Sequence, residues 1–119
     1  MNAEEIRTYC LQKPGVTESL PFDDVSLVFK VMNKMFAILS LDSEPVSINL
    51  KCDPDEAIEL RERFTGVLPG YHMNKQHWNT VLADGSFTAK DLLLWIDNSY
   101  NLIVAGLPKK LKIDLQNLQ

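Results

Sequence analysis

The side chains with the most capacity for polar chemistry lie in residues 69–81, PGYHMNKQHWNTV. Seven of them can stack, donate hydrogen bonds or carry charge: Tyr71, His72, Asn74, Lys75, His77, Trp78 and Asn79. Aromatic rings stack on bases, while lysine and amide groups contact phosphates or base edges, so the mixture suits recognition of a nucleic acid or a small molecule. A long loop also needs such side chains to satisfy its own backbone, so we weigh a structural role equally.

Catalytic and metal motifs are a separate question, and the sequence contains none. His72 and His77 are five residues apart, and a metal site would need another ligand, for which only Asp84 or Cys52 could be invoked. A nucleophile that pairs Cys10 or Cys52 with a histidine has no supporting motif. No Gly-rich nucleotide loop, CxxC, HExxH or Gly-x-Ser-x-Gly is present. We therefore expect a non-enzymatic protein with no catalytic residue, no cofactor and no metal.

Charge bears on the choice of partner. The net charge of −4 disfavours attraction of nucleic acid over the whole surface, yet residues 61–119 hold 7 Lys/Arg against 5 Asp/Glu. Lys109 and Lys110 are therefore candidates for phosphate contact, with a solubilising C-terminal end as the alternative. Lys30 and Lys34 are secondary candidates in an expected hairpin, where lysines also protect sheet edges.

Length and composition set the class of protein. A chain of 119 residues with 45% hydrophobic and 24% charged residues fits one ordinary domain over residues 1–119. No apolar run approaches the roughly 20 residues of a membrane helix, and the acidic N-terminus does not resemble a signal peptide. We expect a cytoplasmic protein with no membrane contact, in which Cys10 and Cys52 are buried thiols.

The elements that must position these side chains begin with a helix. Asn2 and Glu5 form a capping pattern, and Pro14-Gly15 ends the helix that they start. Residues 16–24 are polar and are expected to be a loop. Alternating apolar residues then predict a strand from Val25, a turn at Asn33-Lys34, a second strand over residues 35–41 and a third over residues 46–52.

The second half of the chain predicts two more helices around one strand. Asp53-Pro54 starts a helix that runs to about residue 64, residues 65–76 have no periodicity, and residues 78–83 form a fourth strand. Thr88 and Asp91 cap a last helix, which Gly106 and Pro108 end. The order α-β-β-β-α-β-α predicts an α+β fold with a mainly antiparallel four-stranded sheet and packed helices.

Several segments spread over nearly the whole chain resemble one bacterial family. They are VTES with PF over residues 16–22, the hairpin VFKV to KMFA over residues 28–37, LKCDP over residues 50–54, PGYHMNK and HWNTV over residues 69–81, SY at residues 99–100 and GLPKK over residues 106–110. The chain is similar to the MmcQ/YjbR family. This resemblance implies a small α+β fold of the CyaY-like or secretion-chaperone-like type. It also implies DNA binding, the family's common label, and a name linked to mitomycin resistance, but no catalytic motif.

The chain departs from the family's pattern at two points. Met32-Asn33 stands in the hairpin turn where glycines are common, and Asn33 keeps a turn plausible. Gln76 stands where a second lysine is frequent, which weakens a phosphate contact by this segment.

Two functions follow as expectations. The first is a non-enzymatic protein that binds duplex DNA. The alternative is a binding module for a small aromatic ligand or a protein partner, in a chaperone-like or drug-sequestering role. The position of four residues discriminates, because phosphate contacts must lie on one face: Lys75, His77, Lys109 and Lys110. The DNA hypothesis rests on the family resemblance; it is strengthened if these residues lie on one face and should be dropped if they are scattered.

Overall fold

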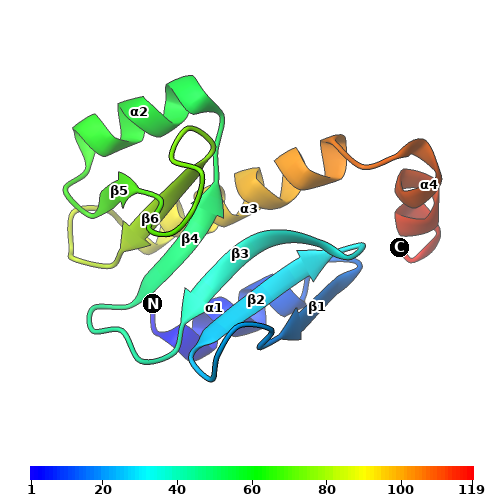
Figure 1. Cartoon of the computed structure of the whole chain (residues 1–119), viewed down its shortest axis with the longest axis horizontal. Helices are drawn as coiled ribbons and strands as arrows, with labels where there is room; N and C mark the ends of the chain where they lie inside the picture. Colours follow the sequence, from blue (N-terminus) through cyan, green and yellow to red (C-terminus); the bar gives the residue numbers. More distant parts are fainter.

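One antiparallel sheet runs through the whole molecule. The computed structural model describes all residues 1–119, with six strands in the order β1-β2-β3-β4-β6-β5 and four helices (Figure 1). The elements are α1 (Ala3–Leu11), β1 (Val16–Ser19), β2 (Ser26–Val31), β3 (Lys34–Ser40), β4 (Ser47–Lys51), α2 (Pro54–Arg63), β5 (Val67–Pro69), β6 (Trp78–Leu82), α3 (Ala89–Ala105) and α4 (Lys109–Asn117). All neighbouring strands are antiparallel, so the predicted α+β class is confirmed.

The sheet has two more strands than predicted. β1 and β5 are the outermost strands and contain four and three residues, in segments that the sequence indicated as loops. Strands this short do not show a period-2 pattern, and Pro69 in β5 is tolerated because the strand lies at an edge. Helix α4 was also not predicted as a separate element, because Pro108 gives its N-terminus no side-chain cap.

The turn between β2 and β3 is one residue earlier than predicted. Met32 and Asn33 have φ angles of 47° and 69°, and Lys34 already pairs with Val31 as the first residue of β3. A two-residue hairpin loop with positive φ at both positions matches the twist of the flanking strands. Asn33 adopts this conformation readily, whereas Met32 adopts it at a cost.

The three predicted helix starts are confirmed by their caps. The Glu5 amide donates to the Asn2 Oδ1 at 2.8 Å, and the Asp91 amide donates to the Thr88 Oγ1 at 3.1 Å. The Asp53 carboxylate caps α2 in the same way. These bonds satisfy amides that have no partner within the helix.

The core lies between the sheet and two helices. Both α1 and α3 lie behind the strands in Figure 1. Alternate residues of the strands point toward them, and Phe29, Leu39 and Ile48 are almost fully buried there against Ile6 and Ile96. The predicted burial of both cysteine thiols, at Cys10 and Cys52, is confirmed, and neither forms a disulfide. None of the helices is long and apolar enough to cross a membrane.

Helix α3 is joined to the sheet by one buried hydroxyl group. Ser99 is fully buried, and its Oγ donates to the carbonyl of Phe36 at 2.6 Å while it accepts the amide of Lys51 at 2.9 Å. These two groups belong to β3 and β4 but lie beyond the residues that the two strands pair with each other. Ser99 therefore supplies hydrogen bonds where the strand ladder ends.

Candidate functional site

The face of the sheet opposite α1 and α3 has no helix over β2, β3 and β4 (Figure 1). The strand register places Val28, Ile38, Asn49, Thr80 and Leu68 side by side in one row across this face. Side chains alternate between the two faces of a strand, so these positions point away from the core. We call this surface the open face.

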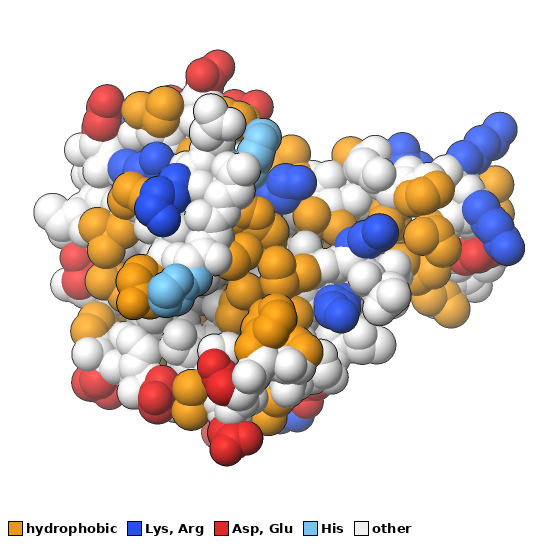
Figure 2. Space-filling model, in the orientation of Figure 1, with side chains coloured by type: hydrophobic (Ala, Val, Ile, Leu, Met, Phe, Trp, Pro, Cys, Tyr) orange, Lys and Arg blue, Asp and Glu red, His pale blue; other side chains and the backbone are white.

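A groove with a volume of about 560 Å³ lies on the open face. Met35, Ile38 and Asn49 contribute to its lining from β3 and β4. The connection between β1 and β2 adds Phe22, and the connection between β5 and β6 adds Tyr71. Figure 2 shows hydrophobic side chains gathered in a hollow in the middle of this face. The volume falls within the range of about 300–1,000 Å³ that is typical of small-molecule sites.

Two aromatic side chains in the lining of the groove are exposed. Phe22 is 70% exposed and Tyr71 is 69% exposed, although large aromatic rings are usually at least half buried. Met35 and Met73 also line the groove, and methionine adapts its shape to different apolar partners. Flexible methionines near two exposed rings suit a flat apolar ligand.

Tyr71 is held over the sheet through its backbone. Its amide donates to the Thr80 Oγ1 at 2.9 Å, and this hydroxyl donates to the Asn49 Oδ1 at 2.6 Å. The next residue, His72, has a φ of 59°, and its ring lies 4.0 Å from the Tyr71 ring between centroids. The loop backbone is thus fixed to the sheet while the two rings stay exposed.

Most of the other polar residues of the segment 69–81 form hydrogen bonds within the loop or to neighbouring backbone. The Asn74 Oδ1 accepts the Gln76 amide at 2.9 Å, and the Asn74 carbonyl accepts the Trp78 amide at 3.0 Å. The Lys75 ammonium donates to the Gly70 carbonyl at 3.1 Å. His77 is half-buried, with its carbonyl bonded to the Cys52 amide at 2.8 Å, and Trp78 is buried. The backbone contacts of the segment are those expected of a structural loop.

Asn79 lies on the other face of the sheet and does not reach the groove. It is 2% exposed, its Oδ1 accepts from the Arg61 Nε at 2.6 Å, and its amide group donates to the Ala57 carbonyl at 3.4 Å. Arg61 also donates to the carbonyls of Lys75 and Trp78. Asn79 therefore joins α2 to β6.

The charges along the open face are not uniform. Asp23 and Asp42 line the groove, and two backbone amides, Val25 at 2.9 Å and Ser26 at 2.6 Å, lower the pKa of the Asp23 carboxyl. The register puts Lys30 and Lys51 two residues beyond the row of Val28 and Asn49, toward the opposite end of the strands. The open face thus has an acidic end and a basic end. In Figure 2, several Asp and Glu side chains lie along the lower margin and Lys and Arg side chains lie above and to the right of the apolar centre, while further Asp and Glu side chains lie along the upper left margin.

The predicted basic residues do not converge on one face. Lys109 and Lys110 lie in the first turn of α4, at the opposite end of the long axis from the β5–β6 loop that carries Lys75 and His77 (Figure 1). Lys30 and Lys34 lie on the β2–β3 hairpin, between these two locations along the long axis. The condition that would have strengthened the DNA hypothesis is not met.

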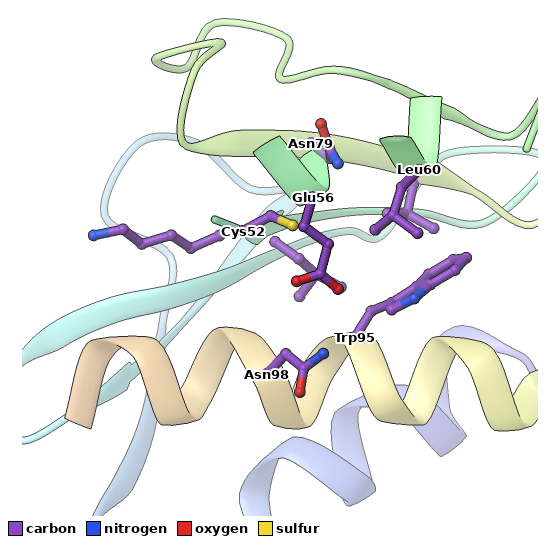
Figure 3. A pocket seen from close by; sticks show the side chains of 9 residues that line it. Cys52, Glu56, Leu60, Asn79, Trp95 and Asn98 are labelled. Atoms are coloured by element: carbon purple, nitrogen blue, oxygen red, sulfur yellow. The ribbon is translucent and has the colours of Figure 1, made fainter. Parts of the chain in front are cut away.

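A second, much smaller cavity lies between α2, α3 and the sheet (Figure 3). Its volume of about 20 Å³ is close to that of one water molecule, and Cys52, Glu56, Trp95 and Asn98 point toward it. Burial, together with the nearby Glu56 and Asp53 carboxylates, raises the pKa of the Cys52 thiol to about 11. This thiol therefore stays protonated near neutral pH and is a poor nucleophile.

The histidines of the segment are not joined by further metal ligands. No three side chains of the His, Cys, Asp and Glu types cluster in a way that could hold a metal ion. The two additional ligands considered from the sequence, Cys52 and Asp84, have other contacts. Cys52 lines the small cavity, and the Asp84 carboxylate accepts a hydrogen bond from the Thr65 hydroxyl at 2.8 Å.

Sequence reasoning identified Tyr71 and His72 but missed most of the groove. Phe22 could have been recognised as a residue of the groove, because it is the lone aromatic residue in the polar stretch of residues 16–24. On the sheet, the sign was that residues 35–41 are apolar at nearly every position, which is more than one buried face requires. Asn49 gave no signal, because a polar residue on the second face of a strand is ordinary.

Comparison with known proteins shows similarity over most of the chain. YjbR of Escherichia coli K12 is 34% identical over 110 residues, which cover 92% of this chain and 93% of that protein. YbdF of Escherichia coli O157:H7 is 35% identical over 107 residues, which cover 90% of this chain and 88% of its own length. Both relatives therefore match nearly from end to end.

The fold is also similar to solved structures. The crystal structure of Deinococcus radiodurans protein DR2400, which carries the domain DUF419, matches with a TM-score of 0.91 and 36% identity over 97% of this chain and 88% of that one. A crystal structure from Pseudomonas syringae matches with a TM-score of 0.74 and 29% identity over 86% of this chain and 98% of that one. The family model YjbR matches residues 11–102, which confirms the predicted resemblance. The chain therefore belongs to the YjbR family.

Proposed function

We propose that the protein binds a small planar aromatic molecule in the groove of the open face. The observation that carries this proposal is the groove itself, about 560 Å³ in volume, with the exposed rings of Phe22 and Tyr71 in its lining. Exposed apolar surface that is concave and bordered by polar groups is a common feature of ligand sites. This choice corresponds to the aromatic-ligand alternative of the sequence analysis.

The chemistry of the lining supports reversible binding. Aromatic pairs contribute about 0.5–1.5 kcal/mol beyond the area that they bury, so two rings would give a flat ligand a clear preference over an aliphatic one. The polar groups at the border, among them Ser40, Asn49 and His72, can orient a ligand by hydrogen bonds. The proposed role is binding or sequestration of the ligand.

Thermal unfolding with planar probes tests this proposal. A ligand at tenfold its Kd stabilises the folded state by about 1.4 kcal/mol, which raises the Tm by several degrees in a domain of this size. We expect acridines or quinones to raise the Tm of the wild-type protein, and Phe22→Ala or Tyr71→Ala to remove most of that shift. Both side chains are exposed, so their loss leaves folding nearly intact.

The matched control is Leu94→Ala. Leu94 is 54% exposed on α3, which lies behind the sheet and away from the groove. This variant should retain the full shift. No shift with any planar probe in the wild-type protein, or an equal loss in all three variants, would reject the proposal.

Binding of duplex DNA is a second candidate, favoured by the family's common label and by one observation. Lys30 and Lys51 border one end of the open face, Lys34 lies next to the adjacent hairpin turn, and a hairpin can contact a DNA backbone. The acidic groups at the other end, Asp23 and Asp42, would repel phosphates. We therefore rank this candidate below the aromatic ligand.

Mobility shifts on duplex DNA over a salt series separate the two candidates. Phosphate contacts bind most tightly at low salt, so a DNA-binding protein must shift the duplex there first. The aromatic-ligand proposal predicts no shift even at low salt. If a shift occurs, the Lys30→Gln/Lys34→Gln variant should weaken it, whereas Lys109→Gln/Lys110→Gln should not.

A further inference from the structure

The lining of the groove contains two carboxylates and no lysine or arginine. Among its twelve residues, the carboxylates are Asp23 and Asp42, the other titratable side chains are Tyr71 and His72, and no lysine or arginine takes part. The nearest lysines on the open face, Lys30 and Lys51, stand two residues further along their strands. Lys51 stands about 7 Å further along β4 than Asn49, and Lys30 is paired with the groove-lining Met35, at the end of the groove away from Asp23 and Asp42. Both lysines therefore border the basic end, and neither contributes to the lining.

Neither carboxylate is neutralised within the protein. The chain contains two ion pairs, Arg7 with Glu18 and Lys13 with Asp97, and both lie away from the groove. Asp42 is exposed and forms neither of the two ion pairs. The Asp23 carboxylate is oriented by the amides of the following residues and by the Ser26 hydroxyl at 3.0 Å, and it stays negatively charged.

We propose that the ligand of the groove carries a positively charged group on its aromatic body, and that Asp42 and Asp23 receive this group. The inference rests on the proposed function, because it names the charge of the molecule that the same groove binds. An apolar body with a cationic end is complementary to an apolar centre with two unpaired carboxylates. An anionic ligand of the same shape would meet repulsion at that end and no basic group in the lining.

A matched series of acridines tests this inference. At neutral pH 9-aminoacridine is a cation, acridine is neutral and acridine-9-carboxylate is an anion, while the three share one planar body. Fluorescence titration of the wild-type protein should give the tightest binding for the cation and the weakest for the anion. Added salt should weaken binding of the cation, because the carboxylates are exposed to solvent.

The variant Asp42→Asn isolates the charge. Because the Asp42 side chain is exposed and belongs to no ion pair, the substitution leaves the fold intact, and thermal unfolding checks that it does. Affinity for 9-aminoacridine should fall about two- to fivefold, as expected for an exposed ion pair, while affinity for acridine stays unchanged. The control is Glu62→Gln on α2, an exposed carboxylate outside the groove, which should change neither affinity.

The possible outcomes separate this inference from the proposed function. Equal binding of all three acridines, tighter binding of the anion, or equal effects of Asp42→Asn and Glu62→Gln would overturn the cationic ligand and leave the aromatic groove standing. If none of the acridines binds, the groove does not accept planar aromatics, and the proposed function fails together with the inference.

Discussion

At the scale of single residues, the polar and aromatic side chains of this protein fall into two groups. Some form hydrogen bonds to the backbone, and others are exposed in the lining of the groove. Asn74, Asn79 and Ser99 are tied to backbone or buried partners, whereas His72 and Tyr71 keep their rings exposed. Both kinds occur in segments that resemble the family, so membership alone does not separate them. Hydrogen bonding in the structure does.

Ser99 gives a prediction at this scale. Replacing Ser99 by Ala leaves the Phe36 carbonyl and the Lys51 amide without their buried partner, and each such loss costs about 1–3 kcal/mol. We expect Ser99→Ala to lower the free energy of unfolding by about 2–4 kcal/mol in urea titrations. Asn101→Ala, at an exposed position on the same helix, should cost little. Equal losses in the two variants would show that the Ser99 hydroxyl adds nothing.

At the scale of elements, the packing of α4 depends on a glycine that lies far from it in sequence. Gly15 precedes β1 with a φ of 72°, and a Cβ atom there would lie 2.7 Å from the Leu115 Cδ1 of α4. Leu115 is buried, so it cannot swing away without exposing apolar surface. The close packing of α4 against the turn therefore requires a residue without a Cβ atom at position 15.

A pair of glycine variants measures this coupling. Gly15→Ala places a Cβ atom at a positive φ and against Leu115, and both effects destabilise the folded state. We therefore expect the free energy of unfolding to fall by about 2–4 kcal/mol. Gly85 also has a positive φ of 90°, but nothing lies within 4 Å of a Cβ there. Gly85→Ala should therefore cost only about 1–2 kcal/mol. If urea unfolding gives the same loss for both, α4 does not press on Gly15.

Some helices and strands could be predicted from the sequence, and others could not. Caps at Asn2, Asp53 and Thr88 predicted the helix starts, because a cap is local chemistry that nearby residues fully determine. The edge strands β1 and β5 were missed because three or four residues have no readable period, and their partners are distant in sequence. The groove was missed for the same reason, since the strand register and two loops bring Phe22, Ile38 and Tyr71 to one place.

At the scale of the whole molecule, burial of ionisable groups on the core side sets the response to alkaline pH. Burial raises the pKa of the Cys10 thiol to about 12 and that of Cys52 to about 11, from an ordinary value near 9. The folded state therefore keeps protons that the unfolded chain releases above pH 9. Stability from these thiols is complete below pH 9 and is lost as the pH rises toward 11 and 12.

Urea unfolding between pH 8 and pH 10 tests this response. We expect the free energy of unfolding to fall by about 2–3 kcal/mol over that interval, since each thiol contributes about 1.4 kcal/mol per pH unit above its unfolded pKa. Cys10→Ala removes one of the two groups and should make the decline shallower. A free energy that stays constant up to pH 10 would mean that the thiols are not buried in their neutral form.

The open face is the other property of the whole molecule, because it combines parts of β2, β3, β4 and two loops. Helices cover one side of the sheet and leave the other free, so that an apolar centre lies between an acidic end and a basic end. A face of this kind exposes apolar surface that folding alone does not require. Binding of an aromatic molecule there is the central claim.

Mapping of amide chemical shifts during a titration with 9-aminoacridine tests that claim most directly. We predict that the shifts concentrate on the groove, at Ser26, Ile38, Asn49, Tyr71 and His72, and leave α4 and the exposed side of α2 unchanged. Shifts centred on α4 or on the small cavity beside Cys52, or no shifts at all, would contradict the account.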